Sequence, residues 1–456
     1  MIKLNIALSK KLNPSLAFLF ILLITFQALN AQDFKVSPQP DRVEEVELSD
    51  KSEVSRYDVN GGYYTRLYDY QINLNNESDF YHTRQKVIFT AGVSAVSEFY
   101  IQFDSTYQKV ELHYLYIWRD GKKIDKTNDL IIEFLSNEEN LQQKIYSGKL
   151  TAFDVLEDIR KGDELEYAYT VYGDNPIFDD NNQRLIPIAD INPIDAFFLK
   201  VITPKEKKMR YNFKGVADSL YTVSELGNDQ IIKFWQTNIK ETELEETIPS
   251  WILPYNYFNL SVFQDWEHVT NWALSVFELE EEPDFTEVFE EMFTGKESRD
   301  EKINKIIDFV QDDIRYMGIE SGIGSIKPFA PNQVLKQRFG DCKDKSLLFV
   351  KLMNEIGIDK AYPVLVNTDF NKGVDSILEA GQNFNHCIAT YFVDTTQYWI
   401  DPTSKLQGGN YKTLTNYDYG KALIIKPGNN SLSDFNINDT ISGSKIIEIL
   451  DVTSDT

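Results

Sequence analysis

The stretch RFGDCKDKS, residues 338–346, places Cys342 between a Gly-Asp turn and the apolar run LLFVKLMNEI at 347–356. That run predicts a buried helix ending before Gly357, because glycine readily takes the left-handed conformation that follows a helix. A cysteine at a helix start lies near the positive end of the dipole and near unpaired backbone N–H groups. Both favour the nucleophilic thiolate, and the same N–H groups could bind an oxyanion. We therefore predict that Cys342 is reactive.

Two possible partners of this cysteine follow in order along the chain. His386 begins the β-branched and aromatic run HCIATYFV, and Asp401 ends the run YWID. The short segment 394–397 joins these runs, which predicts a hairpin with His386 and Asp401 at the same end. A thiol, an imidazole and a carboxylate are the nucleophile, base and orienting group of cysteine-dependent acyl transfer.

These motifs, together with IRYMGIE at 314–320 and SIKP at 325–328, resemble the bacterial transglutaminase-like superfamily. That family carries a Cys-His-Asp triad on a papain-like α+β core, and the resemblance runs from about residue 265 to 426. It implies three roles: nucleophile for Cys342, base for His386 and orienting group for Asp401.

The chain from about residue 60 to 215 resembles a β-rich domain of unknown function that often precedes this core in bacteria. The superfamily includes acyl transferases, peptidases, amidases and inactive members. The resemblance therefore leaves hydrolysis and transamidation open. The alternative to an enzyme is a catalytically inactive binding or scaffold protein of the cell envelope.

Alternating apolar and polar residues mark the N-terminal half, for example at 68–74 and 165–171, with turn signals at 120–121 and 161–163. This pattern predicts an antiparallel β-sandwich. The expected fold class is α+β, a β-sandwich followed by a cysteine-protease-like α+β core. The expected division is a signal peptide at 1–31, a loose polar arm at 32–55, the β-sandwich domain at 56–240, a linker at 241–257, the transglutaminase-like core at 258–428, and a tail or the start of a further β-domain at 429–456.

The first residues have the features of a secretory signal. Lysines at positions 3, 10 and 11 precede an eleven-residue apolar run, and the small residue Ala31 precedes a possible cleavage site, although Leu29 stands where a small residue is usual. This predicts an exported protein, periplasmic or secreted, that meets a membrane only through the transient signal peptide. The alternative is an uncleaved N-terminal anchor.

The charge and composition of the chain limit its partners. The formal net charge is −25 over 456 residues, which disfavours binding to nucleic acid. The acidic run 278–282 has no interleaved histidine, so we interpret it as a solvated face rather than a metal site. We expect no metal or organic cofactor. The expected substrate is a protein or peptide amide, and the β-domain could bind an envelope partner.

Only two cysteines occur, Cys342 and Cys387. In an exported protein an even number invites a disulfide. Successive strand residues point to opposite faces, so a strand that turns His386 toward Cys342 turns Cys387 away. We therefore predict two free thiols, with the Cys342–Cys387 disulfide as the alternative.

Other polar groups near Cys342 are candidates for oxyanion binding or helix capping. The N–H of Cys342 is the first candidate oxyanion donor, and Tyr316 or Gln333 could supply a side-chain donor. Carboxylates beside the nucleophile would oppose thiolate formation, so Asp341 and Asp344 are expected to build the turn and cap the helix. His82 and His113 are expected to be solvated or hydrogen-bonded, and His268 is expected to lie in a helix without a catalytic role.

Overall fold

The computed structural model describes residues 33–49, 54, 59–136, 138, 142, 144–242 and 247–435. The expected signal peptide at 1–31 and the strand-like run at 445–450 lie outside these residues. Contacts between Cα atoms divide the chain into two compact units. Unit 1 comprises the described residues up to Gln264 with 319–326 and 377–380, and unit 2 comprises the remaining described residues.

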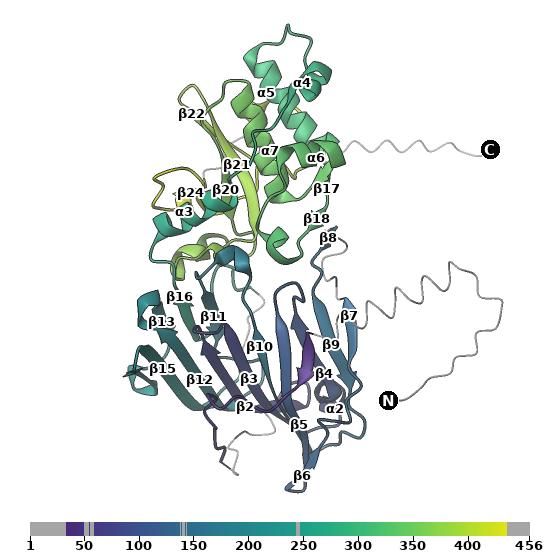
Figure 1. Ribbon diagram of the computed structural model, residues 1–456, viewed down its shortest axis with the longest axis vertical. Coiled ribbons are helices and arrows are strands. Elements are labelled where there is room, and N and C mark those ends of the chain that lie inside the picture. Colours follow the sequence, from purple (N-terminus) through teal and green to yellow (C-terminus); the bar gives the residue numbers. More distant parts are fainter. Residues whose placement is uncertain are drawn as a thin grey trace, which may run out of the picture. The chain divides into compact units, whose positions relative to one another are not determined.

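Unit 1 is built on one nine-stranded sheet (Figure 1). Its strands, in spatial order, are β1 (Phe34–Val36), β5 (Lys109–Arg119), β10 (Glu164–Tyr172), β3 (Ser78–Val87), β2 (Tyr63–Asn73), β12 (Ile194–Pro204), β15 (Asp229–Ile239) and β14 (Tyr221–Leu226), with β6 (Lys122–Asp125) paired to β5. Two three-stranded sheets accompany it: β4 (Glu98–Phe103), β9 (Leu150–Val155) and β7 (Glu133–Ser136), and β11 (Gln183–Pro187), β16 (Tyr257–Ser261) and β13 (Arg210–Lys214).

The alternation in the sequence gives the large sheet one apolar and one polar face. On β10, Leu165 and Tyr167 pack into an apolar cluster with Phe99 and Ile101 of β4. Neighbouring strand residues point to opposite faces, so Glu164 and Glu166 project from the other face. A second apolar cluster joins the large sheet to β11 and β16. Each small sheet therefore covers part of the apolar face.

The β-rich character of this half is confirmed, but an antiparallel β-sandwich is not. Strand β1 runs parallel to β5, and β12 runs parallel to β2, with Ile194 opposite Thr65. Parallel neighbours need a long crossover, and 120 residues separate β2 from the start of β12 in the chain. Side-chain alternation is the same for both strand directions, so the sequence pattern does not distinguish them.

The described part of the expected polar arm, residues 33–49, is not loose. Phe34 and Val43 are both buried. The backbone of Glu44 exchanges two hydrogen bonds with the Gln71 side chain, at 2.9 and 2.7 Å. Two apolar anchors and paired backbone groups therefore hold this segment to unit 1, although its composition is polar.

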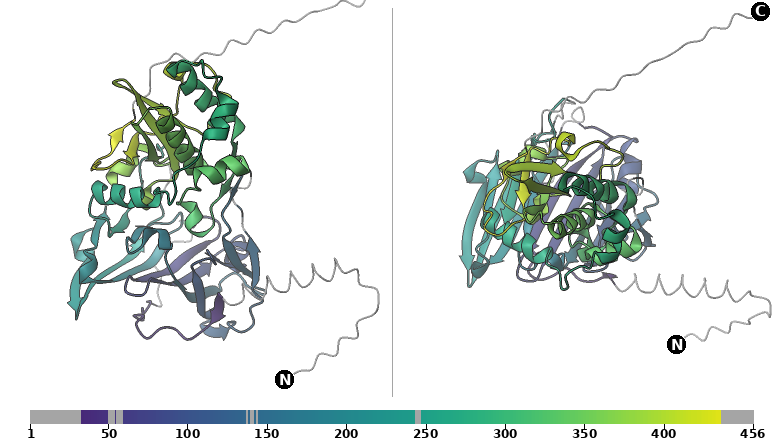
Figure 2. Two further views of the ribbon diagram at one scale, coloured as in Figure 1. Left: turned by 45° about the horizontal axis from the view of Figure 1, so that its top comes forward. Right: turned by 90° about the horizontal axis from the view of Figure 1, so that it is seen from above.

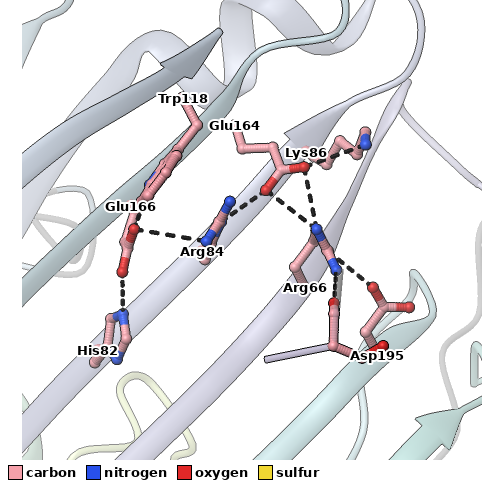
Figure 3. A network of polar contacts seen from close by, with 9 residues as sticks. Arg66, His82, Arg84, Lys86, Trp118, Glu164, Glu166 and Asp195 are labelled. Atoms are coloured by element: carbon pink, nitrogen blue, oxygen red, sulfur yellow. Dashed lines mark hydrogen bonds and ion pairs between the residues drawn. The ribbon is translucent and has the colours of Figure 1, made fainter. Parts of the chain in front are cut away.

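Buried charges gather on the polar side of the large sheet (Figure 3). Glu164 accepts from Arg84 at 2.6 Å and lies 3.2 Å from the Lys86 ammonium. The Arg66 guanidinium lies 3.3 Å from Glu164 and 3.1 Å from Asp195. Burial disfavours the Glu164 carboxylate, but the charges of Arg84, Arg66 and Lys86 lower its pKa below the ordinary value. Ion pairs thus compensate for the desolvation of these groups.

The same network continues through His82. Its Nε2 lies 2.9 Å from Glu166, and its Nδ1 lies 3.5 Å from Asp69. Glu166 also accepts from the Trp118 indole. Burial disfavours the imidazolium, but hydrogen bonds and charges from Asp69 and Glu166 raise the pKa of His82 above its ordinary value. His82 is thus hydrogen-bonded, as the sequence analysis predicted.

Replacing His82 with glutamine is expected to destabilise unit 1 more in mild acid than in alkali. Because the folded pKa is raised, the stability from protonated His82 is fully present below the unfolded pKa of about 6.5 and is lost as pH rises through the folded value. We expect a deficit of about 1 kcal/mol near pH 6 that shrinks by pH 9. Thermal unfolding of both proteins across this range measures it, and a deficit independent of pH would contradict the assignment.

Two short segments from late in the chain belong to unit 1. The backbone N–H of Gly322 donates to Asp104 at 3.1 Å. Arg210 donates to the Glu379 carboxylate at 2.5 Å, and Ser261 donates to the Glu379 carbonyl at 2.7 Å. Unit 1 is therefore completed by residues far beyond its last long strand.

Unit 2 combines helices with a five-stranded antiparallel sheet. The sheet order is β22 (Thr396–Ile400), β21 (His386–Val393), β20 (Ala361–Val366), β23 (Lys421–Ile424) and β24 (Ser433–Asp434). The helices are α3 (Trp266–Val276), α4 (Thr286–Met292), α5 (Arg299–Asp308), α6 (Pro331–Gln337) and α7 (Cys342–Glu355). Figures 1 and 2 show α5, α6 and α7 gathered on one side of β20 and β21.

Local signals explain where these helices begin and end. Ser298 and Glu301 form the predicted capping box at the start of α5. Gly357, just beyond α7, takes the left-handed conformation with φ of 88°. None of the helices in the described ranges combines the length and apolar character needed to cross a membrane.

Candidate active site

Cys342 is the first residue of α7, as the sequence predicts. The Asp341 side chain accepts from the backbone N–H groups of Lys343 and Asp344, at 3.1 and 3.3 Å. The Asp344 carboxylate in turn accepts from the Asp341 N–H at 3.0 Å. The predicted capping roles of both aspartates are thus confirmed, and this reciprocal box fixes the chain on both sides of Cys342.

The turn before Cys342 requires a glycine. A Cβ atom on Gly340 would lie 2.7 Å from the Cβ of Asp344, closer than two carbon atoms can approach. The second carboxylate oxygen of Asp344 accepts from the Phe329 N–H at 2.7 Å. Gly340 therefore lets the capping aspartate lie directly beneath the turn that presents the cysteine.

His386 and Asp401 meet at one end of the predicted hairpin. Strands β21 and β22 pair from Ala389↔Ile400 to Val393↔Thr396, which leaves a two-residue turn. The His386 Nε2 lies 3.0 Å from the Asp401 Oδ2. Since Asp401 occupies Nε2, Nδ1 is the ring nitrogen left for the Cys342 thiol.

The Asp401 carboxylate is saturated with donors. Its Oδ1 accepts from the N–H and the hydroxyl of Thr403, at 2.8 and 2.7 Å. Its Oδ2 accepts from the Tyr419 hydroxyl at 2.7 Å besides His386. The Asp401 carbonyl also accepts from Gln311 at 2.9 Å. This buried carboxylate has little freedom to rotate.

The charges of these residues are coupled. Burial disfavours the His386 imidazolium, but hydrogen bonds to Asp401 and Cys342, and their charges, raise the pKa of His386 to about 10. Burial likewise opposes ionisation of Asp401, but His386, Thr403 and Tyr419 lower its pKa to about 2. At neutral pH the pair is therefore an imidazolium beside a carboxylate, and the Cys342 side chain also interacts with this imidazole.

Family models match two parts of the sequence. Residues 286–402, which include Cys342, His386 and Asp401, match the family model of the transglutaminase-like superfamily. The C-terminal part of the chain is a transglutaminase-like core. Residues 75–243 match the model of a domain of unknown function with solved structures, DUF3857. No curated protein matches the sequence.

One solved structure shows the same fold. A crystal structure of a proposed protease from Parabacteroides distasonis superimposes with a TM-score of 0.63 at 12% identity, over 82% of this chain and 71% of that chain. Aminopeptidase A of Legionella pneumophila, in complex with aspartic acid, reaches a TM-score of 0.26 at 10% identity, over 46% and 23% of the two chains. The first likeness shows a shared fold alone, and the second is too weak to show one.

The two candidate oxyanion residues of the transglutaminase-like core lie in different settings. Tyr316 is half-buried in β17 (Arg315–Tyr316), which pairs with β19 (Phe339–Gly340), so Tyr316 lies opposite Gly340. Gln333 is exposed on α6, where it donates to Gln337 at 3.4 Å. Only Tyr316 is thereby brought beside the turn that carries Cys342.

Both cysteines are free and buried, as predicted. The orientation of Cys387 differs from the prediction, because its side chain interacts with α7 instead of pointing away from it. Burial raises the pKa of the Cys387 thiol well above its usual range, the charge of Cys342 raises it further, and a hydrogen bond with Ser346 partly opposes this. The Cys387 side chain is therefore buried in unit 2, next to Ser346 of α7.

Several residues of the transglutaminase-like core around Asp401 were not predicted from the sequence. The contact of Thr403 with Asp401 could have been predicted from the sequence. An aspartate side chain often accepts from the N–H two residues later and so forms an Asx turn. No sequence pattern predicted the contacts of Gln311 and Tyr419 with Asp401. Gln311 lies in a π-helical turn, η6 (Phe309–Asp313), and Tyr419 lies in the irregular chain before β23. Their contacts with Asp401 depend on the tertiary fold.

Proposed function

We propose that the transglutaminase-like core catalyses cysteine-dependent acyl transfer from a protein or peptide amide to water or to an amine. One observation carries the proposal: His386 interacts with both Asp401 and Cys342, and Cys342 is the first residue of a helix. This arrangement supports the proposed roles of nucleophile for Cys342, proton carrier for His386 and orienting carboxylate for Asp401. The proposed setting is outside the cytoplasm, because the first 31 residues have the composition of a secretory signal.

In the proposed reaction the Cys342 sulfur attacks the amide carbonyl carbon. The carbonyl oxygen becomes an oxyanion, for which the backbone N–H of Cys342 is the proposed donor, because the next two N–H groups of α7 already donate to Asp341. The His386 imidazolium gives its proton to the leaving nitrogen, the C–N bond breaks, and a thioester remains on Cys342. Water or an amine then attacks the thioester while His386 takes its proton, which releases a carboxylic acid or a new amide and restores the thiolate.

Selective alkylation tests the proposed nucleophile. Incubation of the folded protein with iodoacetamide at neutral pH, followed by peptide mass spectrometry, is expected to label Cys342 and to spare Cys387. Cys342 is the first residue of a helix and interacts with the His386 imidazole, whereas burial raises the pKa of Cys387 well above its usual range.

The control is the His386→Gln variant, in which labelling of Cys342 is expected to slow by at least about tenfold, the effect of removing a stabilising charge worth about 1.4 kcal/mol. Unfolding in urea should label both cysteines and so verifies detection. Equal labelling of both cysteines in the folded protein, or no labelling of Cys342, would refute the nucleophile and favour an inactive binding or scaffold protein.

A further inference from the structure

Tyr419 makes a specific contact with the proposed catalytic machinery. Its hydroxyl donates to Asp401 Oδ2 at 2.7 Å, the same oxygen that lies 3.0 Å from His386 Nε2. The rings of Tyr419 and His386 also face each other, with centroids 5.7 Å apart and planes inclined by 44°. One side chain thus contacts two members of the proposed site.

The protein holds Tyr419 firmly in this position. Its side chain is only 5% exposed and packs edge-on against Phe435, with centroids 5.4 Å apart. It belongs to the apolar cluster that includes Val366 and Trp399, on the sheet that also carries His386. The hydroxyl therefore reaches Asp401 from a rigid support.

We propose that Tyr419 is a positioning residue that sets how strongly Asp401 holds the proton on His386. This proposal rests on the proposed function. A phenol that donates to Oδ2 takes up part of the negative charge that His386 would otherwise face alone. His386 must release its proton to the leaving nitrogen, so a carboxylate that binds the imidazolium too tightly would slow that step.

The chemistry of Tyr419 suits a permanent donor. Burial, then the charge of Asp401, raises the pKa of Tyr419 well above its usual range. The hydroxyl therefore stays protonated at neutral pH and does not compete with His386 as an acid or base. Because Thr403 already occupies Oδ1 with two hydrogen bonds, Oδ2 is the oxygen whose charge Tyr419 and His386 divide.

The test is Tyr419→Phe, which keeps the ring and removes the hydroxyl. The matched control is Tyr417→Phe, the same change two residues earlier at a side chain that is 76% exposed. Since the chain has four histidines, selective isotope labelling gives an assignable NMR titration of His386. We expect the His386 pKa to rise by about half a unit to one unit in Tyr419→Phe and to stay unchanged in Tyr417→Phe.

With peptide amide substrates, kcat is expected to fall about three- to tenfold in Tyr419→Phe with KM unchanged, and the alkaline limb of the rate profile should move upward with the His386 pKa. Should Tyr419→Phe fold poorly, site-specific replacement of Tyr419 by 3-fluorotyrosine, a stronger donor, is expected to lower the His386 pKa. An unchanged or lowered His386 pKa in folded Tyr419→Phe would overturn the proposal.

The titration needs no turnover, so the two proposals fail separately. A raised His386 pKa in Tyr419→Phe, together with an inert Cys342 in the wild-type protein, would support the positioning role of Tyr419 and reject the proposed reaction. A reactive Cys342 with an unmoved His386 titration would do the opposite.

Discussion

Replacing Cys342 with alanine is expected to lower kcat for peptide amides by about a millionfold, the effect of removing the nucleophile from a three-residue catalytic unit. His386→Ala should cost about as much, because without His386 the leaving nitrogen receives no proton. Asp401→Ala should cost less, about ten thousandfold, since an orienting group acts through the imidazole. Release of amine or carboxylic acid from a library of peptide amides measures all three variants.

The matched control for this series is Cys387→Ala. It removes the other thiol of the chain from the same core, one residue from His386 in sequence. We expect it to cost about 1 kcal/mol of stability, the ordinary effect of a modest change in a core, and to keep most of the activity. Activity in Cys342→Ala comparable to the wild-type level would disprove the assignment of the nucleophile.

Replacing Arg66 with methionine is expected to have the largest effect on stability among the substitutions considered. Methionine retains the aliphatic bulk, but Asp195 and Glu164 lose a buried cation 3.1 and 3.3 Å away. Removing one partner of a buried ion pair costs about 3–5 kcal/mol, because the other charge remains desolvated. For a unit of this size we expect the melting temperature to fall by about 6–15 °C.

The control for Arg66→Met is the same substitution at Arg160. Arg160 lies 2.6 Å from Asp158, but both side chains are more than half exposed. An exposed pair contributes under about 1 kcal/mol, so Arg160→Met should barely change the melting temperature. Differential scanning calorimetry, with hydrogen exchange at β2 to identify the transition of unit 1, makes the comparison. Equal effects at the two arginines would mean that the buried network does not stabilise unit 1.

The parts of the candidate site that the sequence predicted are those built from residues close together in the chain. The stretch 338–346 contains the turn, the capping aspartates and the cysteine together, so the start of α7 follows from neighbouring residues alone. The hairpin that joins His386 to Asp401 is equally local, with a turn of two residues. Tyr419 lies 18 residues beyond Asp401 in chain without a periodic pattern, and only the tertiary fold brings its hydroxyl to that carboxylate.

In the N-terminal half, the alternation of apolar and polar residues indicates strands but not their order in the sheet. Alternation predicted its strands correctly, but strand order is set by contacts between distant segments, so the parallel pairs β1/β5 and β2/β12 were not foreseen. The segment 33–49 was expected to be loose because it is polar. Two buried apolar residues, Phe34 and Val43, anchor it to unit 1. The average composition of a segment does not reveal two such residues among many polar ones.

The membership of 319–326 and 377–380 in unit 1 has a consequence for biosynthesis. On the ribosome, the chain up to Gln264 emerges before the residues that pair with Asp104 and Arg210 exist. At roughly 5–20 residues per second, the wait from Gln264 to Ala380 is on the order of ten seconds. The nascent N-terminal half must therefore persist incomplete during this interval, and it is then that a chaperone or a protease would meet it.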